Sequence, residues 1–320
     1  MVNALVVLSR PRLLPFLLLL VAGGYGWAHW DRALFARHPA SLLWVVLAWT
    51  ALNAGTLWLN AALDRDEGPV LYGGKVSIPD RIAEWGYAAL VAAVLLALPA
   101  GPKPAAAAAI CALLAVGYSH PRLAWKGHPI GGPLVNWLGY GLLTPFAGWA
   151  VVDVPANPRT LLILAGVSSA VLGAYFAAQA FQADEDRARG YRTLVATHGS
   201  AAALLAARIC VGLAVLDALL LAAIGWLPRE CLLGAPAFLW LDRWLDGWAR
   251  RPAGGSEADA REFARRALIG GITGILLATV DYVGDSVAHH PVAGLGTRGG
   301  HPPDRTVDDW RAEWASRSGL

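Results

Sequence analysis

Two short groups of carboxylates are the residues of this chain best suited to chemistry. The first lies within residues 64–67 (D-R-D-E) and the second within 184–186 (D-E-D), and each follows a long apolar run. One charged cluster at a helix end is usually a solvated face, but two at matching positions need a cation to relieve their mutual repulsion. Oxygen ligands of this kind suit Mg²⁺, whose shell is completed by waters and substrate phosphates. The pattern therefore predicts a magnesium site at the ends of two membrane helices.

Amide side chains extend both groups. Asn60 precedes Asp64 by four residues, and Gln182 precedes Asp186 by the same spacing. Residues so spaced share one face of a helix, so we expect each amide beside its carboxylate at the end of a helix. The predicted metal ligands are Asn60, Asp64, Asp66, Glu67, Gln182, Asp184 and Asp186.

Basic residues lie in the segments that follow the two acidic groups and in a loop between them. Charged donors of this kind bind phosphate oxygens, so they suit the oxygens of a diphosphate that a metal ion does not reach. The residues predicted to bind a diphosphate are Asn60, Lys75, Arg122, Lys126, Arg187 and Arg192.

The elements that position these residues are predicted to be membrane helices. Of the 320 residues, 56% are apolar and 15% are charged, whereas soluble domains contain about 25% charged residues. No basic run alternates with exposed aromatic residues, which argues against nucleic-acid binding. Three widely separated cysteines (Cys111, Cys210 and Cys231) in apolar surroundings argue against a zinc site and against structural disulfides.

We therefore expect an all-α, polytopic membrane bundle of about nine transmembrane helices around a central cavity open to the cytoplasmic side. The bundle is expected to occupy residues 1–283, and residues 284–320, rich in Gly, Pro, His and charge, to form a polar, flexible tail. The expected helices lie at about 11–30, 41–63, 80–99, 104–118, 132–152, 160–183, 200–226, 231–248 and 263–283.

The distribution of basic residues predicts the orientation of the bundle. With the N-terminus in the cytoplasm, most of the Lys and Arg residues in loops lie on the cytoplasmic side, as the positive-inside rule requires. Both acidic groups and the loop 118–129 then share the cytoplasmic face. We expect a multi-pass protein of the cell inner (plasma) membrane with its site on that face.

The two acidic stretches, N-A-A-L-D-R-D-E-G and Q-A-D-E-D-R-A-R-G-Y-R-T, resemble the aspartate-rich motifs of the UbiA-type intramembrane prenyltransferases. Asn60 and Asp64 match the first motif, N-D-x-x-D-x-x-x-D. The second motif is D-x-x-x-D followed by a Gly four residues on and then by R-T or S-T, and it is matched by Asp186, Gly190, Arg192 and Thr193. Tyr118 and Lys126 are also similar to residues of the family's helix 4–5 region. The resemblance extends over about residues 8–283.

Three positions depart from these motifs. Ala61 and Gly68 stand where the first motif has aspartates, and Gln182 stands where the second motif begins with one. The resemblance therefore implies a metal site with fewer carboxylates than the family pattern provides.

The resemblance implies an integral-membrane enzyme that moves an isoprenoid group from an allylic prenyl diphosphate to a lipophilic or aromatic acceptor, with Mg²⁺ as the cofactor. The residues with implied catalytic roles are Asp64, Asp186, Lys126 and Tyr118. Aromatic faces suited to stabilising an allylic carbocation belong to Trp58, Tyr118, Tyr140 and Tyr175.

Two alternatives remain at this point. A UbiA-type terpene cyclase would ionise the same substrate and close it on itself. A cation-linked transporter or a non-catalytic membrane scaffold would need no such chemistry, but transporters are typified by internal repeats and charges at mid-membrane depth. Here the carboxylates lie at helix ends and no long repeat stands out.

Overall fold

The computed structural model describes residues 2–32, 38–64, 77–251 and 255–289, and these are helical with short connections. The chain forms α1 (Val2–Leu8), η1 (Pro11–Leu13), α2 (Leu14–Arg32), α3 (Pro39–Asp64), α4 (Ile82–Ala97), η2 (Leu98–Ala100), α5 (Pro102–Ser119), η3 (Trp125–Gly127), α6 (Gly131–Asn136), the π-helical η4 (Trp137–Leu143), α7 (Thr144–Ala150), α8 (Pro158–Gln179), α9 (Ala183–Ala188), α10 (Leu194–Ala223), η5 (Arg229–Gly234), α11 (Ala235–Ala249) and α12 (Glu257–His289).

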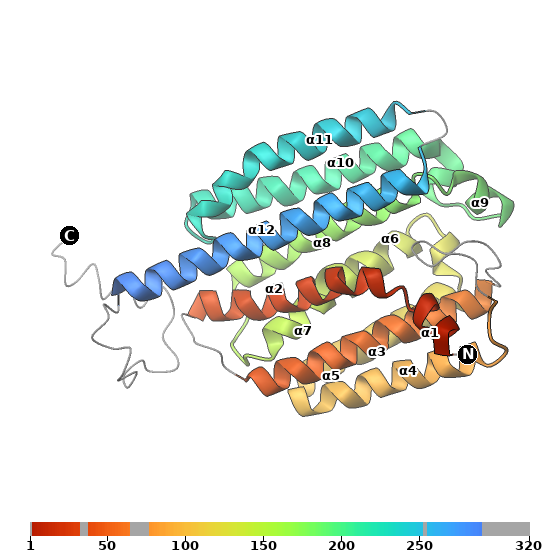
Figure 1. Cartoon of the computed structure of the whole chain (residues 1–320), viewed down its shortest axis with the longest axis horizontal. Helices are drawn as coiled ribbons and strands as arrows, with labels where there is room; N and C mark the ends of the chain where they lie inside the picture. Colours follow the sequence, from red (N-terminus) through yellow and green to blue (C-terminus); the bar gives the residue numbers. More distant parts are fainter. Residues whose placement is uncertain (1, 33–37, 65–76, 252–254, 290–320) are drawn as a thin grey trace.

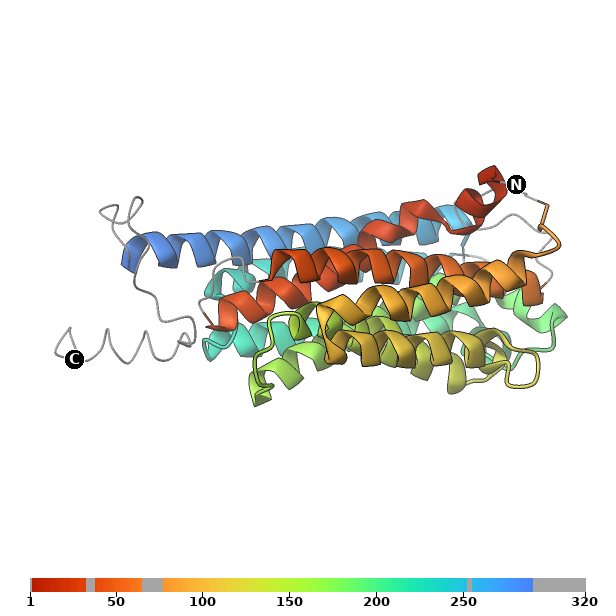
Figure 2. The same ribbon diagram turned by 90° about the horizontal axis from the view of Figure 1, so that it is seen from below.

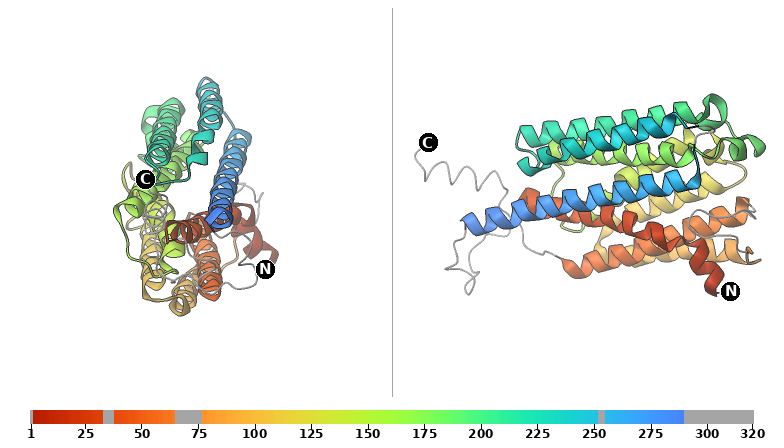
Figure 3. Two further views of the ribbon diagram at one scale, coloured as in Figure 1. Left: turned by 90° about the vertical axis from the view of Figure 1, so that its left-hand side faces the viewer. Right: turned by 45° about the horizontal axis from the view of Figure 1, so that its top comes forward.

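The long helices run along the long axis of the molecule (Figures 1 and 2). In Figure 3, α3, α4 and α5 gather on one side of the bundle, α8, α10 and α11 gather on the other, and α2 and α12 lie between them. Apolar side chains point outward from these helices, among them Leu113 (71% exposed) and Leu205 (55% exposed). Such a surface suits lipid, since soluble proteins rarely expose so much contiguous apolar area.

Seven helices in the described part of the chain are long and apolar enough to cross a membrane, which supports a multi-pass membrane protein. They cover Ala4–Trp30, Pro39–Asp64, Ile82–Ala100, Pro102–Ser119, Pro158–Gln179, Leu194–Ala223 and Glu257–Asp281. The other two of the nine expected spans have a different form. Residues 132–152 are built from α6, η4 and α7 in succession, and residues 231–248 from η5 and α11. The all-helical membrane fold is confirmed, and the count of nine stays a prediction.

Glycines let α2 and α7 approach closely. A Cβ atom on Gly24 would lie 1.8 Å from the carbonyl oxygen of Pro145, and one on Gly148 would lie 1.9 Å from that of Val21. Small residues of this kind are typical of contacts between membrane helices, where packing replaces the hydrophobic driving force. The contact holds α2 directly against α7.

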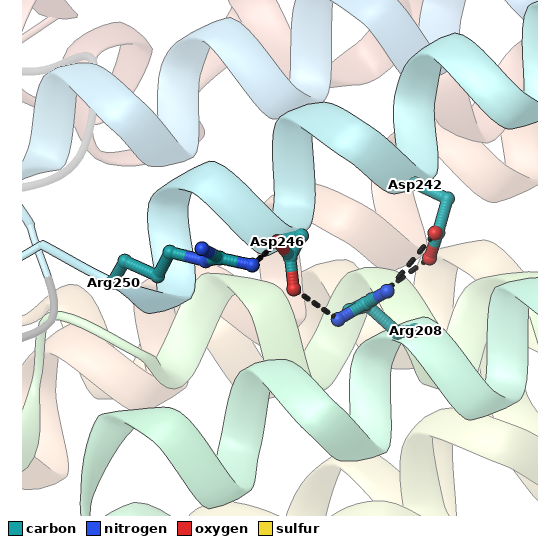
Figure 4. A network of polar contacts seen from close by, with 4 residues as sticks. All are labelled: Arg208, Asp242, Asp246 and Arg250. Atoms are coloured by element: carbon teal, nitrogen blue, oxygen red, sulfur yellow. Dashed lines mark hydrogen bonds and ion pairs between the residues drawn. The ribbon is translucent and has the colours of Figure 1, made fainter.

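Charged residues attach α11 to α10 (Figure 4). The Arg208 guanidinium on α10 donates to both carboxylate oxygens of Asp242 (2.8 and 3.0 Å) and to Asp246 (2.7 Å). Arg250 donates to the second oxygen of Asp246 (2.6 Å). The four formal charges cancel, which reduces the cost of holding them in a membrane-embedded bundle.

Several helix boundaries differ from those expected. The helix expected at 160–183 ends at Gln179. There the chain tightens into a turn in which the backbone N–H of Gln182 donates to the backbone carbonyl of Gln179 (2.9 Å). The helix expected to start at residue 200 starts instead at Leu194 and kinks at Gly199, whose φ is 81°. The last helix, expected at 263–283, extends over Glu257–His289. Most of the expected tail, residues 290–320, lies outside the described residues.

Candidate active site

The first half of the site lies at the end of α3. Asp64 is the last residue of that helix and its side chain is 5% exposed. The Lys126 ammonium contacts Asp64 Oδ1 and donates to Asn60 Oδ1 (3.0 Å). Ser119 at the end of α5 also donates to Asn60 Oδ1 (3.2 Å). The four-residue spacing thus puts Asn60 and Asp64 on one face as predicted, and both face the same lysine.

A short turn aims Lys126 into the bundle. The turn η3 follows Ala124, whose backbone is left-handed (φ 42°). The Trp125 ring packs so tightly on Gly117 of α5 that a Cβ atom there would lie 2.4 Å from it. This packing fixes the turn and leaves Lys126 8% exposed. Burial lowers the pKa of Lys126 to about 8, and the positive charge of Arg189 acts in the same direction.

The second half of the site lies in α9 and the loop after it. Asp186 is 8% exposed, and its carboxylate accepts a hydrogen bond from the Thr193 hydroxyl (2.5 Å). Thr193 also starts α10, because its oxygen accepts from the Ala196 amide (3.3 Å). Burial raises the pKa of Asp186, and the Thr193 hydrogen bond and the charge of Arg189 oppose that rise. One threonine therefore fixes both the second acidic group and the helix that follows.

Backbone contacts hold the two loops together. The Arg192 amide donates to the Gly127 carbonyl (2.8 Å). The Tyr191 ring lies against Gly127, where a Cβ atom would be 2.6 Å from the ring. The turn that carries Lys126 is therefore in direct contact with the loop that follows Asp186.

Arg189 joins the two acidic groups, and sequence analysis did not assign it a role. One nitrogen of its guanidinium lies 3.4 Å from Asp64 Oδ2, and another lies 2.8 Å from Glu185 Oε1. The sequence signal that could have identified Arg189 was its position three residues after Asp186 and next to Gly190. Its approach to Asp64, 125 residues earlier, is a tertiary contact that sequence spacing does not reveal.

The remaining predicted residues have other positions or lie outside the described residues. Gln182 is the residue before α9, so it and Asp186 do not share the end of α8 as expected, because α8 ends at Gln179. Asp184 is 98% exposed and pairs with Arg187 (3.1 Å). The side chains of Arg122 and Arg192 are exposed. Asp66, Glu67 and Lys75 lie outside the described residues.

A cavity of about 210 Å³ runs from Asn60 into the bundle between α3, α5 and the π-helical segment. Tyr118, which was predicted to be catalytic, lines it together with Tyr140 and Asn136. Arg10 lines it from the junction of α1 and η1, where its backbone is left-handed (φ 48°). Sequence analysis did not select Arg10, since it lies in the N-terminal segment before the first acidic group.

The donor set fits a magnesium ion that carries a diphosphate. Asp64 and Asp186 are the carboxylates that could hold it, and Asn60 is an amide oxygen beside Asp64. Mg²⁺ takes one or two protein carboxylates and completes its shell with waters and phosphate oxygens. Among the residues that the structure describes, no group of three His, Cys, Asp or Glu side chains converges to form a complete protein cage.

The chain is similar in fold to a UbiA homologue from Archaeoglobus fulgidus bound to GPP and Mg²⁺ (16% identity, TM-score 0.63, 87% of this chain and 100% of that chain covered). It is also similar to a digeranylgeranylglyceryl phosphate synthase (15% identity, TM-score 0.61, 89% of this chain and 100% of that chain covered). An apo UbiA homologue from Aeropyrum pernix K1 has a similar fold as well (17% identity, TM-score 0.56, 85% of this chain and 98% of that chain covered).

No curated protein sequence matches the chain significantly. The model of the UbiA prenyltransferase family matches residues 12–259, which is most of the chain and includes both acidic groups. The chain belongs to the UbiA prenyltransferase family.

Proposed function

We propose that this protein is an integral-membrane prenyltransferase that moves an isoprenoid group from an allylic prenyl diphosphate to a lipophilic or aromatic acceptor. The observation that carries the proposal is the meeting of Asp64, Lys126 and Arg189 beside the Asn60 end of a cavity enclosed by helices. The solved structures of the Archaeoglobus fulgidus homologue hold GPP or DMAPP together with Mg²⁺, which supports a substrate of the same class here.

In this proposal the diphosphate lies at the polar end of the cavity. Lys126 and Arg189 donate to its oxygens, and Asp64 and Asp186 orient these cations and hold the metal. A bound Mg²⁺ would supply positive charge to the leaving diphosphate. Groups fixed in advance around developing charge are the largest common source of catalysis, and here burial and ion pairs fix them before the substrate arrives.

The isoprenoid group lies deeper, in the part of the cavity lined by Tyr118 and Tyr140. When the bond between the allylic carbon and the diphosphate oxygen breaks, both electrons leave with the diphosphate and an allylic cation remains. The aromatic faces stabilise this cation, and the surrounding helices keep water away from it. The acceptor attacks the cation and loses a proton.

The test is incubation of the purified protein with labelled prenyl diphosphates of several lengths, Mg²⁺ and a membrane lipid extract as the source of acceptor. The expected result is a prenylated product that needs both substrates, identified by mass. A cyclic hydrocarbon formed without extract would instead make the protein a terpene cyclase. If prenyl diphosphate and Mg²⁺ neither react nor raise the melting temperature, a transporter or scaffold role would replace the enzyme. Reaction in sealed inverted vesicles would test the proposed cytoplasmic face.

A further inference from the structure

A second cavity, of about 420 Å³, lies between the first and the last of the long helices. These helices, α2 and α12, are neighbours in the middle of the bundle (Figure 3). The cavity shares no lining residue with the one that begins at Asn60, so it is separate from the proposed diphosphate site. Its lining residues are Arg12 from η1, Phe16 from α2, and Ala258, Arg261, Glu262, Arg265 and Leu268 from α12. Three guanidinium groups from two distant parts of the chain therefore meet at one hollow.

The cavity lies where the two helices reach the edge of the membrane core. At the far end of the helix pair, the Trp30 indole donates to Asp281 (2.6 Å). The hydrocarbon core takes about 20 residues of helix, and about that many residues back from this contact the helices carry Arg12 and Arg261. Both arginines therefore lie at the depth of the lipid headgroups, at the end of the bundle that carries α9 (Figure 1).

Apolar groups form the deeper part of the cavity. Phe16 and Leu268 lie about 6 and 10 Å further along their helices than the two arginines, at a rise of about 1.5 Å per residue. Below them the helices close on each other, since a Cβ atom on Gly271 would lie 2.6 Å from the Leu19 side chain. The cavity is thus cationic at headgroup depth and apolar toward the lipid tails, which is the polarity of a phospholipid.

The charges of α12 do not balance at the cavity. Arg261 pairs with Glu257 (2.6 Å). Glu262 accepts from Arg265 (2.7 and 2.8 Å) and also from Arg266 (2.6 Å). Three arginines therefore share two glutamates, and this part of α12 keeps one positive charge in excess.

Arg12 adds a second unmatched charge. It is exposed in η1 and has no hydrogen bond or ion pair with any residue that the structure describes. Arginines at the membrane edge also serve as topology signals, but that role requires neither a cavity nor the convergence of arginines from separate helices. Guanidinium groups bind phosphate oxygens through paired N–H donors. A phosphate in the cavity would supply the acceptors that Arg12 lacks.

We propose that this cavity binds the headgroup of an anionic phospholipid, with the phosphate between Arg12 and the arginines of α12 and an acyl chain along Phe16 and Leu268. Basic pockets between membrane helices bind anionic lipid headgroups by the same chemistry. The bound lipid joins α2 to α12 at the membrane edge. The proposal does not rest on the proposed function, because lipid binding requires no turnover and involves none of the residues assigned to the diphosphate.

The experiment is native mass spectrometry of the full-length, delipidated protein in a neutral detergent. Phosphatidylglycerol and phosphatidylcholine with the same oleoyl chains are titrated separately, and each bound lipid is identified by its mass. The variants are Arg12→Gln, which removes the unmatched charge, and Ala258→Trp, which fills the cavity without removing a charge. Arg81→Gln is the matched control, because Arg81 is exposed just before α4 and pairs with Glu84 outside the cavity.

We expect wild type to bind phosphatidylglycerol about 5- to 30-fold more tightly than phosphatidylcholine, since one or two unmatched arginines contribute about 1 kcal/mol each toward an anionic lipid. Arg12→Gln should weaken phosphatidylglycerol binding by about 5-fold and leave phosphatidylcholine binding unchanged. Ala258→Trp should remove the preference, and Arg81→Gln should match wild type. A merely structural Arg12 would lower the melting temperature of the lipid-free protein and leave the preference between the two lipids unchanged.

Equal wild-type affinities for the two lipids would overturn the proposal. A preference kept by Arg12→Gln and Ala258→Trp, or lost as much in Arg81→Gln, would show a general response to surface charge and would remove the cavity as the site. If one of the two cavity variants fails to fold, the other decides alone. Sodium phosphate, compared with sodium chloride at equal ionic strength, should not displace phosphatidylglycerol. Displacement by phosphate alone would assign the cavity to a soluble anion and overturn the lipid as its ligand.

Discussion

Replacement of Lys126 by methionine separates the two roles of a buried charge, because it should weaken diphosphate binding far more than it weakens folding. Lys126 is 8% exposed and contacts both Asp64 and Asn60. Methionine has a similar length and no charge. The variant therefore removes the cation and largely preserves the packing around it.

Two effects on folding stability nearly cancel. At pH 7 the lysine is charged in both states, since pH 7 lies below its folded pKa of about 8 and its ordinary value of 10.5. A folded pKa lowered to about 8 costs about 3 kcal/mol of stability at that pH, at about 1.4 kcal/mol per pKa unit, and methionine removes this cost. Leaving Asp64 without Lys126 costs about 3 kcal/mol, the lower figure for a broken buried pair, because Arg189 remains beside it.

Binding has no such cancellation. Loss of a charge-assisted contact to the diphosphate costs about 1.5–3 kcal/mol, which corresponds to a Kd raised by about 10- to 100-fold. Calorimetric titration of the detergent-solubilised protein with geranyl S-thiolodiphosphate in the presence of Mg²⁺ gives the Kd. Thermal unfolding in the same detergent gives the stability. Lys103→Met is the matched control, because Lys103 pairs with Asp153 near the start of α5, at the opposite end from Ser119. An unchanged Kd in Lys126→Met, or an equal loss in Lys103→Met, would refute the reasoning.

Three further predictions concern the acidic groups, the α2–α7 contact and the charges on α10. Asp64→Ala and Asp186→Ala should each reduce product formation to background while size-exclusion chromatography shows a folded protein; turnover in either variant would remove that residue from the site. Gly24→Ala should lower the melting temperature by the equivalent of about 1–3 kcal/mol, because the added Cβ would overlap the Pro145 carbonyl. Gly23→Ala is the control and should leave the melting temperature unchanged, because a Cβ there meets nothing within 4 Å. Equal melting temperatures of the two variants would contradict the packing argument. Arg208→Leu should destabilise the bundle by about 1.5–3 kcal/mol in reversible unfolding, since it removes the charge-assisted hydrogen bonds to two half-buried aspartates while Asp246 keeps Arg250. A wild-type unfolding curve would show that the network contributes nothing to stability.

The parts of the site that depend on local spacing could be predicted from the sequence. Asn60 and Asp64 share a face because α3 stays helical through Asp64, and an apolar helix that ends in a carboxylate is recognisable without a structure. The long apolar runs likewise predicted an all-helical membrane bundle. The contact of Lys126 with Asp64 puts the loop 118–129 at the same end of the bundle as the first acidic group, and the diphosphate role of Lys126 remains a prediction.

Contacts between distant segments could not be predicted in the same way. Arg189 reaches Asp64 only because α9 folds back toward the end of α3, and nothing near Arg189 in the sequence encodes that approach. The end of α8 at Gln179 was missed because neither glycine nor proline marks the turn, and the apolar pattern continues through Phe181. The π-helical segment Trp137–Leu143 was missed because its residues carry an ordinary helical pattern.

The charge network of α10 and α11 has a consequence for how the protein enters the membrane. A single charged residue at the centre of a helix opposes insertion by about 2.5–3.5 kcal/mol. The helix α11 is shorter than the seven candidate spans and carries Asp242 and Asp246 within 15 residues. Asp246 has Arg250 at the end of its own helix as a second partner, but Asp242 is neutralised by Arg208 only when α10 is already alongside. The two helices should therefore leave the translocation machinery as a pair, with α10 retained at its exit until α11 has been synthesised. Biogenesis of this half of the bundle is then a single cooperative event, in contrast to the independent insertion open to the strongly apolar helices α3 and α4.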